Sequence, residues 1–102
     1  MADQKAMNRQ TWAALKSEGF APGSDLPVDA YFFLTDEAST RALGAELQEG
    51  GWRADVSVDD LNVVASCTIA RVRLTDLDRM VDELEALAAR HGAEFDGWGA
   101  QL

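Results

Sequence analysis

Cys67 and His91 are the residues best suited to nucleophilic chemistry, and the 102-residue chain holds one of each type. A catalytic thiol needs a nearby base that takes its proton and lowers its pKa. Cys67 falls in the middle of an apolar strand pattern, where a thiol is usually a small buried hydrophobe. His91 falls at the end of a helical pattern. We therefore predict that this protein is not an enzyme.

Carboxylates are the next candidates, because calcium is bound by closely spaced acidic residues. Asp55-x-Ser57-x-Asp59 resembles the start of a calcium loop. The match fails further on, since Asp60 stands where the loop needs glycine and Ser66 stands where it needs glutamate. The sequence therefore predicts no metal and no cofactor.

A second acidic set lies at i, i+4 and i+7 on the outer side of a predicted helix and consists of Asp78, Asp82 and Glu85. Such a run is either a solvated helix face or a docking site for basic residues. Both interpretations stay open, and the three residues remain candidate partner-binding residues.

The net charge of the chain limits which kinds of partner it can bind. Nine Lys and Arg stand against 18 Asp and Glu, which gives a net charge of −9. Residues 1–23 hold three basic and two acidic residues, or +1, so the remaining residues carry −10. Phosphate contacts need Lys and Arg, whereas an acidic surface attracts basic proteins. We expect a protein partner and no direct binding of nucleic acid.

The same sequence features predict a reducing cytoplasm. Cys67 has no second cysteine with which to form an internal disulfide. The first ten residues lack the apolar core of a secretory signal, and no apolar run approaches the ~20 residues that span a bilayer. We expect no membrane association.

Hydrophobic periodicity predicts one small α+β domain with a leading helix. Residues 3–18 form an amphipathic helix that Gly19 ends, and residues 20–27 form a linker. We place the N-terminal helix and the start of the linker in residues 1–23 and the domain in residues 24–102. The leading helix has one narrow apolar side.

Within the domain, the apolar spacing alternates between periods of two and of three to four. Strands are expected over 28–34, 52–58, 61–71 and 93–98. One helix is capped by Thr35 or Asp36 and ends at Gly50-Gly51, and a second is capped by Thr75 with Asp78 reaching back. The order β-α-β-β-α-β predicts a ferredoxin-like sandwich, with two helices on one face of an antiparallel sheet.

This arrangement leaves one sheet face without helices of its own. Strand alternation puts Val28, Ala30, Phe32 and Leu34 on the helix side. The open face then carries Tyr31, Phe33, Val64, Ser66 and Thr68, with Trp98 near its edge. Monomers seldom expose large apolar patches, so we expect the leading helix to cover this face with Met7, Trp12 and Leu15. The alternative is a partner site.

Three segments carry a family resemblance. Ala93–Gly99 contains Asp-Gly-Trp, Leu74–Gly92 is a long amphipathic helix, and Leu26–Phe33 is an aromatic strand. Together they are similar to the regulator of ribonuclease activity B family, the ribonuclease E inhibitor domain. Characterised members of that family continue beyond the Asp-Gly-Trp motif into an acidic tail, whereas this sequence stops at Leu102.

The resemblance implies a cytoplasmic bacterial protein without catalytic activity. It implies binding to the noncatalytic scaffold region of ribonuclease E and slower RNA turnover. Asp96, Gly97 and Trp98 match the family motif. For these residues we expect a strand bulge at Gly97 and cover of the sheet edge by Trp98, with partner contact as the other interpretation. The alternative function is a small-molecule-binding or homo-oligomerisation module that uses the open face.

Overall fold

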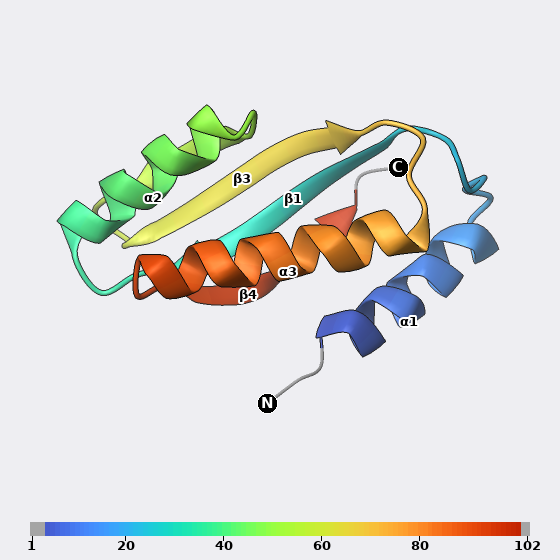
Figure 1. Cartoon of the computed structure of the whole chain (residues 1–102), viewed down its shortest axis with the longest axis horizontal. Coiled ribbons are helices and arrows are strands. Elements are labelled where there is room, and N and C mark those ends of the chain that lie inside the picture. Colours follow the sequence, from blue (N-terminus) through green and yellow to red (C-terminus); the bar gives the residue numbers. More distant parts are fainter. Residues whose placement is uncertain (1–3, 101–102) are drawn as a thin grey trace.

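The computed structural model describes the backbone of residues 4–100 and the side chains of residues 7–100. The elements are α1 (Gln4–Ser17), β1 (Leu26–Phe33), α2 (Glu37–Glu49), β2 (Arg53–Ser57), β3 (Asn62–Ile69), α3 (Leu74–Arg90) and β4 (Glu94–Ala100) (Figure 1). The four strands form one antiparallel sheet in the order β2-β3-β1-β4. The molecule is therefore an α+β protein with three helices.

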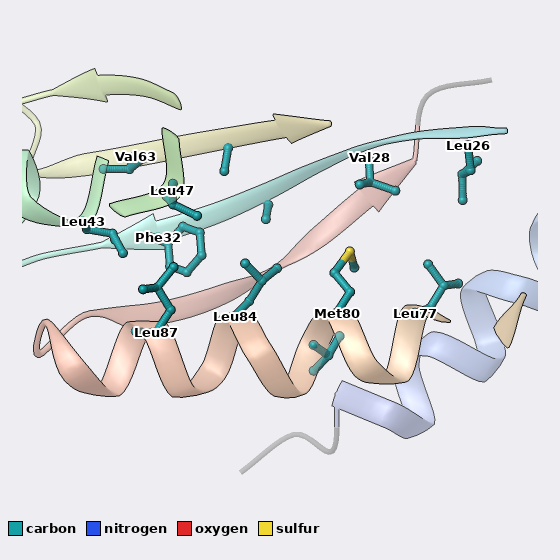
Figure 2. Close-up of a cluster of buried hydrophobic side chains, with 14 of the residues drawn as sticks. Leu26, Val28, Phe32, Leu43, Leu47, Val63, Leu77, Met80, Leu84 and Leu87 are labelled. Carbon is teal, nitrogen blue, oxygen red and sulfur yellow. The ribbon is translucent and has the colours of Figure 1, made fainter. Parts of the chain in front are cut away.

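The hydrophobic core lies between the sheet and the helices α2 and α3. Val28, Ala30 and Phe32 of β1 are buried, as their alternation predicts. Figure 2 shows Val28 and Phe32 facing a row of α3 side chains at three- and four-residue spacing, Leu77, Met80, Leu84 and Leu87. The inward parity of the central strand is confirmed.

The first strand begins earlier than the sequence pattern indicates. Leu26 is fully buried and pairs with Ile69, and Pro27 pairs with Thr68. The linker therefore ends at Asp25. Proline is tolerated here because the pairing of β1 with β4 begins only at Val28, so Pro27 lies where the strand is paired on one side.

The two domain helices differ in how well their starts were predicted. Asp36 caps α2, because its Oδ1 accepts the backbone N–H of Ser39 at 2.7 Å. The cap of α3 is not Thr75 with Asp78, since the helix begins at Leu74 and Asp76 accepts the N–H of Arg73 at 2.9 Å. The predicted pair, Thr75 and Asp78, has the same three-residue spacing as the observed pair, Arg73 and Asp76. The prediction therefore placed the start of the helix two residues too late.

Close approach between α2 and β2 depends on a glycine. Gly44 is buried, and a Cβ added there would lie 2.4 Å from Cγ2 of Val56. Apolar periodicity predicts that Ala38, Ala42, Leu43 and Leu47 form the buried side of α2. Leu43 and Leu47 are buried, whereas Ala38 and Ala42 are exposed. Thr40 and Gly44 are buried in place of the two alanines: the Thr40 hydroxyl is satisfied by the Asp36 carbonyl at 2.7 Å, and Gly44 lets the helix approach Val56 of β2.

The β2–β3 hairpin closes through residues 58–61, with Ser57 paired to Asn62. Asp59 and Asp60 lie in this turn as expected, but Leu61 has a φ of 54° and belongs to the turn. Strand β3 is therefore shorter than predicted at both ends.

Helix α1 does not cover the open face of the sheet. It packs against α3, and Trp12 and Leu15 enter the same core as the strand residues (Figure 1). Tyr31 and Phe33 stay 38% and 45% exposed, and Met7 is exposed as well. The expectation that α1 covers the open face is wrong. The one narrow apolar side of α1 packs against α3, so the helix has no second apolar side to place on the sheet.

Candidate functional site

The open face of the sheet is organised around Tyr31 and Phe33. In an antiparallel sheet, residues directly opposite one another share a face. Tyr31 lies opposite Val64 of β3, and Phe33 lies between Asn62 of β3 and Glu94 of β4. The exposed aromatic residues therefore form a central apolar stripe along β1.

A β-bulge interrupts the pairing of β1 with β4 beside Tyr31. Ala30 pairs with Trp98 and Phe32 pairs with Phe95, so Asp96 and Gly97 together face Tyr31. Gly97 has a φ of 103°, a conformation that residues with a Cβ rarely adopt. The expectation of a bulge at Gly97 is confirmed.

Trp98 follows this bulge and pairs with the buried Ala30, so it lies on the helix side of the sheet and not at the edge of the open face, and it contacts α1. Its indole Nε1 donates to Oδ1 of Asn8 at 2.6 Å, and Nδ2 of Asn8 donates to Oδ1 of Asp78 at 3.1 Å. Asn8 is fully buried. Its amide thus joins β4, α1 and α3 in one hydrogen-bonded chain.

Sequence reasoning missed Asn8, although a signal was present. Asn8 precedes Trp12 by four residues and Leu15 by seven, so it falls on the apolar side of the leading helix. A polar residue at a core position needs hydrogen-bond partners. Trp98 and Asp78 supply them.

A small hollow lies beside the bulge. It has a volume of about 280 Å³ and is lined by Met7, Thr11, Tyr31, Asp96, Gly97 and Trp98. Four of the predicted partner-binding residues therefore meet at one place. The hydroxyl of Tyr31 lies 3.7 Å from the position of a Cβ on Gly99, so the ring leans over β4.

Charged side chains surround the aromatic stripe, and most of them are acidic. The register places Asp29, Asp55 and Glu94 on the open face, and the exposed Asp96 lines the adjoining hollow. Asp29 accepts a hydrogen bond from Ser66 at 2.5 Å. Arg53, opposite Ser66, is the one basic residue that the described pairing places there. The face therefore carries an excess of negative charge.

The acidic run on α3 does not join this face. Helix α3 packs on the opposite side of the sheet (Figure 2). Asp82 and Glu85 are exposed, whereas Asp78 is half-buried and holds Asn8. The eight predicted residues thus divide into an open-face set with its hollow, a structural Asp78, and two exposed carboxylates on the helix side.

Cys67 and His91 do not form a catalytic pair. Cys67 and Met80 line the same groove. His91 follows Met80 by eleven residues at the end of α3, which corresponds to about 16 Å along the helix axis at a rise of 1.5 Å per residue. Nε2 of His91 lies 3.4 Å from Oε1 of Glu46. Burial raises the pKa of the Cys67 thiol, and the hydrogen bond from Arg90 lowers the pKa of Glu46. A thiol of raised pKa is a poor nucleophile at neutral pH.

Comparison with known proteins settles the family. Residues 5–100 match the family described as regulator of ribonuclease activity B. The chain belongs to the regulator of ribonuclease activity B family. No curated protein matches the chain. The family is one of ribonuclease regulators and not of enzymes, which agrees with the separation of Cys67 from His91.

The family match covers α1 as well as the sheet. It begins at residue 5 and ends at residue 100, so both Asn8 and the Asp-Gly-Trp motif lie inside the regulator of ribonuclease activity B region. None of the helices in the described part of the chain is long and apolar enough to cross a membrane.

Proposed function

We propose that this regulator of ribonuclease activity B family member binds a basic segment of a ribonuclease through the open face of its sheet. The observation that carries the proposal is the stripe of Tyr31 and Phe33, exposed and flanked by Asp29, Asp55 and Glu94. Apolar side chains of the partner gain burial on the stripe, and Lys or Arg beside them meets the carboxylates.

The charge of the face favours a protein over RNA as the ligand. Sheets that bind RNA stack bases on strand aromatics, but they also need basic residues for the phosphates. Here the net charge of the whole chain is −9. A phosphate backbone is repelled by such a surface, whereas a basic peptide is attracted to it.

The proposed partner is ribonuclease E or its noncatalytic scaffold region, and the proposed outcome is slower RNA turnover in a bacterial cytoplasm. The family description supports regulation of a ribonuclease. The strand order β2-β3-β1-β4 and the two helices on one face support the proposed ferredoxin-like arrangement, which leaves the opposite face free for the partner.

Capture of ribonuclease E by the immobilised protein tests this proposal. Purified ribonuclease E scaffold segment is passed over wild-type protein, over a Tyr31→Ser, Phe33→Ser variant, and over Val56→Ser. Val56 is a matched control because it is 40% exposed and faces α2 instead of the open face. We expect the wild type and Val56→Ser to retain the segment at low salt and to release it as salt rises.

The open-face variant is expected to retain at least about tenfold less, since two large apolar contacts are lost. Equal capture by all three proteins would place the partner elsewhere. An RNA-decay assay with ribonuclease E gives the functional readout, and decay that stays unchanged across a titration of wild-type protein would exclude inhibition. Native mass spectrometry of the protein alone separates the alternative, because a homodimer that the open-face variant abolishes would assign the stripe to self-association.

A further inference from the structure

We propose that the hollow beside the bulge is a subsite for the guanidinium group of one arginine side chain. The identity of the protein that presents this arginine rests on the proposed function, but the binding of the side chain does not. The hollow is lined by a carboxylate, two aromatic rings and a thioether, from Asp96, Tyr31, Trp98 and Met7. Carboxylates and aromatic faces are the two groups that recognise a guanidinium.

The size of the hollow fits a single side chain. Its volume of about 280 Å³ lies below the range of about 300–1,000 Å³ that is typical of sites for drug-sized ligands. A helix or a strand of a partner is far too large to enter it. The open-face stripe beside it offers room for the rest of an extended segment, so the arginine acts as an anchor at one end of the face.

Two walls of the hollow, Trp98 and the Asp96–Gly97 backbone, are held by contacts within the protein before a ligand arrives. The Trp98 indole N–H is already used by Asn8, so the residue presents its ring and no donor. The bulge at Gly97 holds Asp96 next to Tyr31, and Tyr31 leans toward Gly99. Preorganised groups lose little freedom on binding, which favours affinity.

The Asp96 carboxylate is the one ionised group that lines the hollow. Asp96 is exposed, and within residues 7–100 no side chain or backbone group bonds to its carboxylate. A cation can therefore pair with it without displacing a bond within the described part of the protein. Thr11 offers a hydroxyl as a further acceptor at the rim.

Arginine suits this site better than lysine. Its guanidinium is planar, so it stacks on Tyr31 or Trp98 while its edge donates two hydrogen bonds to one carboxylate. An ammonium is a compact, strongly hydrated charge and makes only one of these contacts well. We therefore expect the subsite to bind arginine more tightly than lysine, although both side chains carry one positive charge.

Titration of the full chain with three short peptides tests the preference. The peptides are acetyl-Gly-Arg-Gly-amide and its lysine and citrulline counterparts, and binding is followed by NMR at the Trp98 indole N–H and the Gly97 amide. We expect the arginine peptide to shift both signals. Relative to the arginine peptide, the lysine peptide is expected to bind about threefold more weakly and the uncharged citrulline peptide about tenfold more weakly, because charge-assisted hydrogen bonds are lost.

Asp96→Asn removes the carboxylate while it keeps the shape of the side chain. We expect it to lower the affinity for the arginine peptide about tenfold, and Asp59→Asn, which removes the same charge in the exposed β2–β3 turn, to change it less than about twofold. Tyr31→Leu is a second variant, and it is expected to remove the preference for arginine over lysine. The NMR spectrum of each variant reports its fold.

Equal affinity for arginine and lysine would overturn the proposal, as would equal effects of Asp96→Asn and Asp59→Asn. Shifts confined to residues of the groove that Cys67 and Met80 line would also overturn it. Because the peptide titration contains no ribonuclease, a bound arginine peptide with no capture of ribonuclease E leaves the subsite standing and rejects the function. If wild type and Asp96→Asn capture ribonuclease E equally and the arginine peptide shifts neither the Trp98 nor the Gly97 signal, the function stands and the subsite is rejected.

Discussion

The indole N–H of Trp98 donates to the side-chain carbonyl of Asn8 at 2.6 Å and so joins positions that are 90 residues apart. The bond ties the last strand to the first helix, and Asn8 extends it to Asp78 on α3. The amide of Asn8 matches both partners, since its oxygen accepts from an indole and its nitrogen donates to a carboxylate. The buried Asn8 side chain therefore holds α1 against β4 and α3, together with the core contacts of Trp12 and Leu15, and it orients the Trp98 wall of the hollow.

Asn8→Ala is expected to destabilise the protein by about 2–3 kcal/mol. The substitution leaves the Trp98 N–H and the Asp78 carboxylate without their partner and opens space in a buried position. Urea unfolding followed by circular dichroism measures the change. Gln10→Ala, an exposed substitution on the same helix, is the control and is expected to stay within about 0.5 kcal/mol of wild type. Equal stability of both variants would contradict a structural role for Asn8.

Gly97→Ala is expected to destabilise the protein by about 1–3 kcal/mol, because alanine strains the backbone at a φ of 103°. Gly99→Ala, two residues further along β4, is the matched control. Its Cβ meets the Tyr31 hydroxyl at 3.7 Å, an ordinary contact, so little change is expected. Thermal unfolding of both variants measures the difference. Tolerance of alanine at both positions would show that the bulge does not require glycine.

The contribution of Asp36 to stability is expected to depend on pH. The backbone N–H of Ser39 lowers the pKa of Asp36 below its ordinary value of 3.8 in the folded protein. A group with a depressed folded-state pKa stabilises the protein above its unfolded-state pKa, and this contribution is lost as pH falls through the folded-state pKa. Asp36→Ala should therefore cost stability at neutral pH and progressively less below pH 3.8.

Urea unfolding at a series of pH values checks this expectation. Glu85→Ala, which removes an exposed carboxylate from the middle of α3 where it caps no helix, is the control for the loss of one negative charge. A difference between wild type and Asp36→Ala that stays constant from neutral to acid pH would contradict the capping role of the carboxylate.

Cys67 is expected to react slowly with iodoacetamide at neutral pH. Burial raises the pKa of its thiol, so little thiolate is present, and the side chain is partly shielded by the groove. Alkylation should be at least about tenfold slower in the folded protein than in urea. Cys67→Ala should leave ribonuclease regulation unchanged. Fast alkylation in the folded state, or loss of regulation in the variant, would contradict the assignment of Cys67 as a packing residue.

Much of the fold could be predicted from the pattern of apolar residues. The period of two in β1 fixed which of its side chains are buried, because successive strand residues point to opposite faces. The three- and four-residue spacing of α3 fixed its core-facing side in the same way. The family resemblance, carried by the Asp-Gly-Trp segment, is confirmed over residues 5–100. Local periodicity and short motifs suffice for these features.

The ends of elements were predicted less well, since they depend on which side chain reaches a free backbone group. Both Thr75 and Asp76 carry oxygens that can accept a backbone N–H at the start of α3. Only the folded backbone decides that Asp76 accepts the N–H of Arg73. The same holds for Leu61, whose apolar side chain suggests a strand although its φ of 54° belongs to a turn.

The sequence by itself determined the class of fold, the buried faces of its central strand and last helix, and the acidic character that favours a basic protein partner. Only the tertiary structure decided that α1 packs on α3 and leaves Tyr31 exposed, and that Asp96, Trp98 and Tyr31 meet in one hollow. The physical reason is that these features depend on contacts between residues far apart in the chain. Asn8 becomes a core residue only when Trp98 and Asp78 arrive beside it.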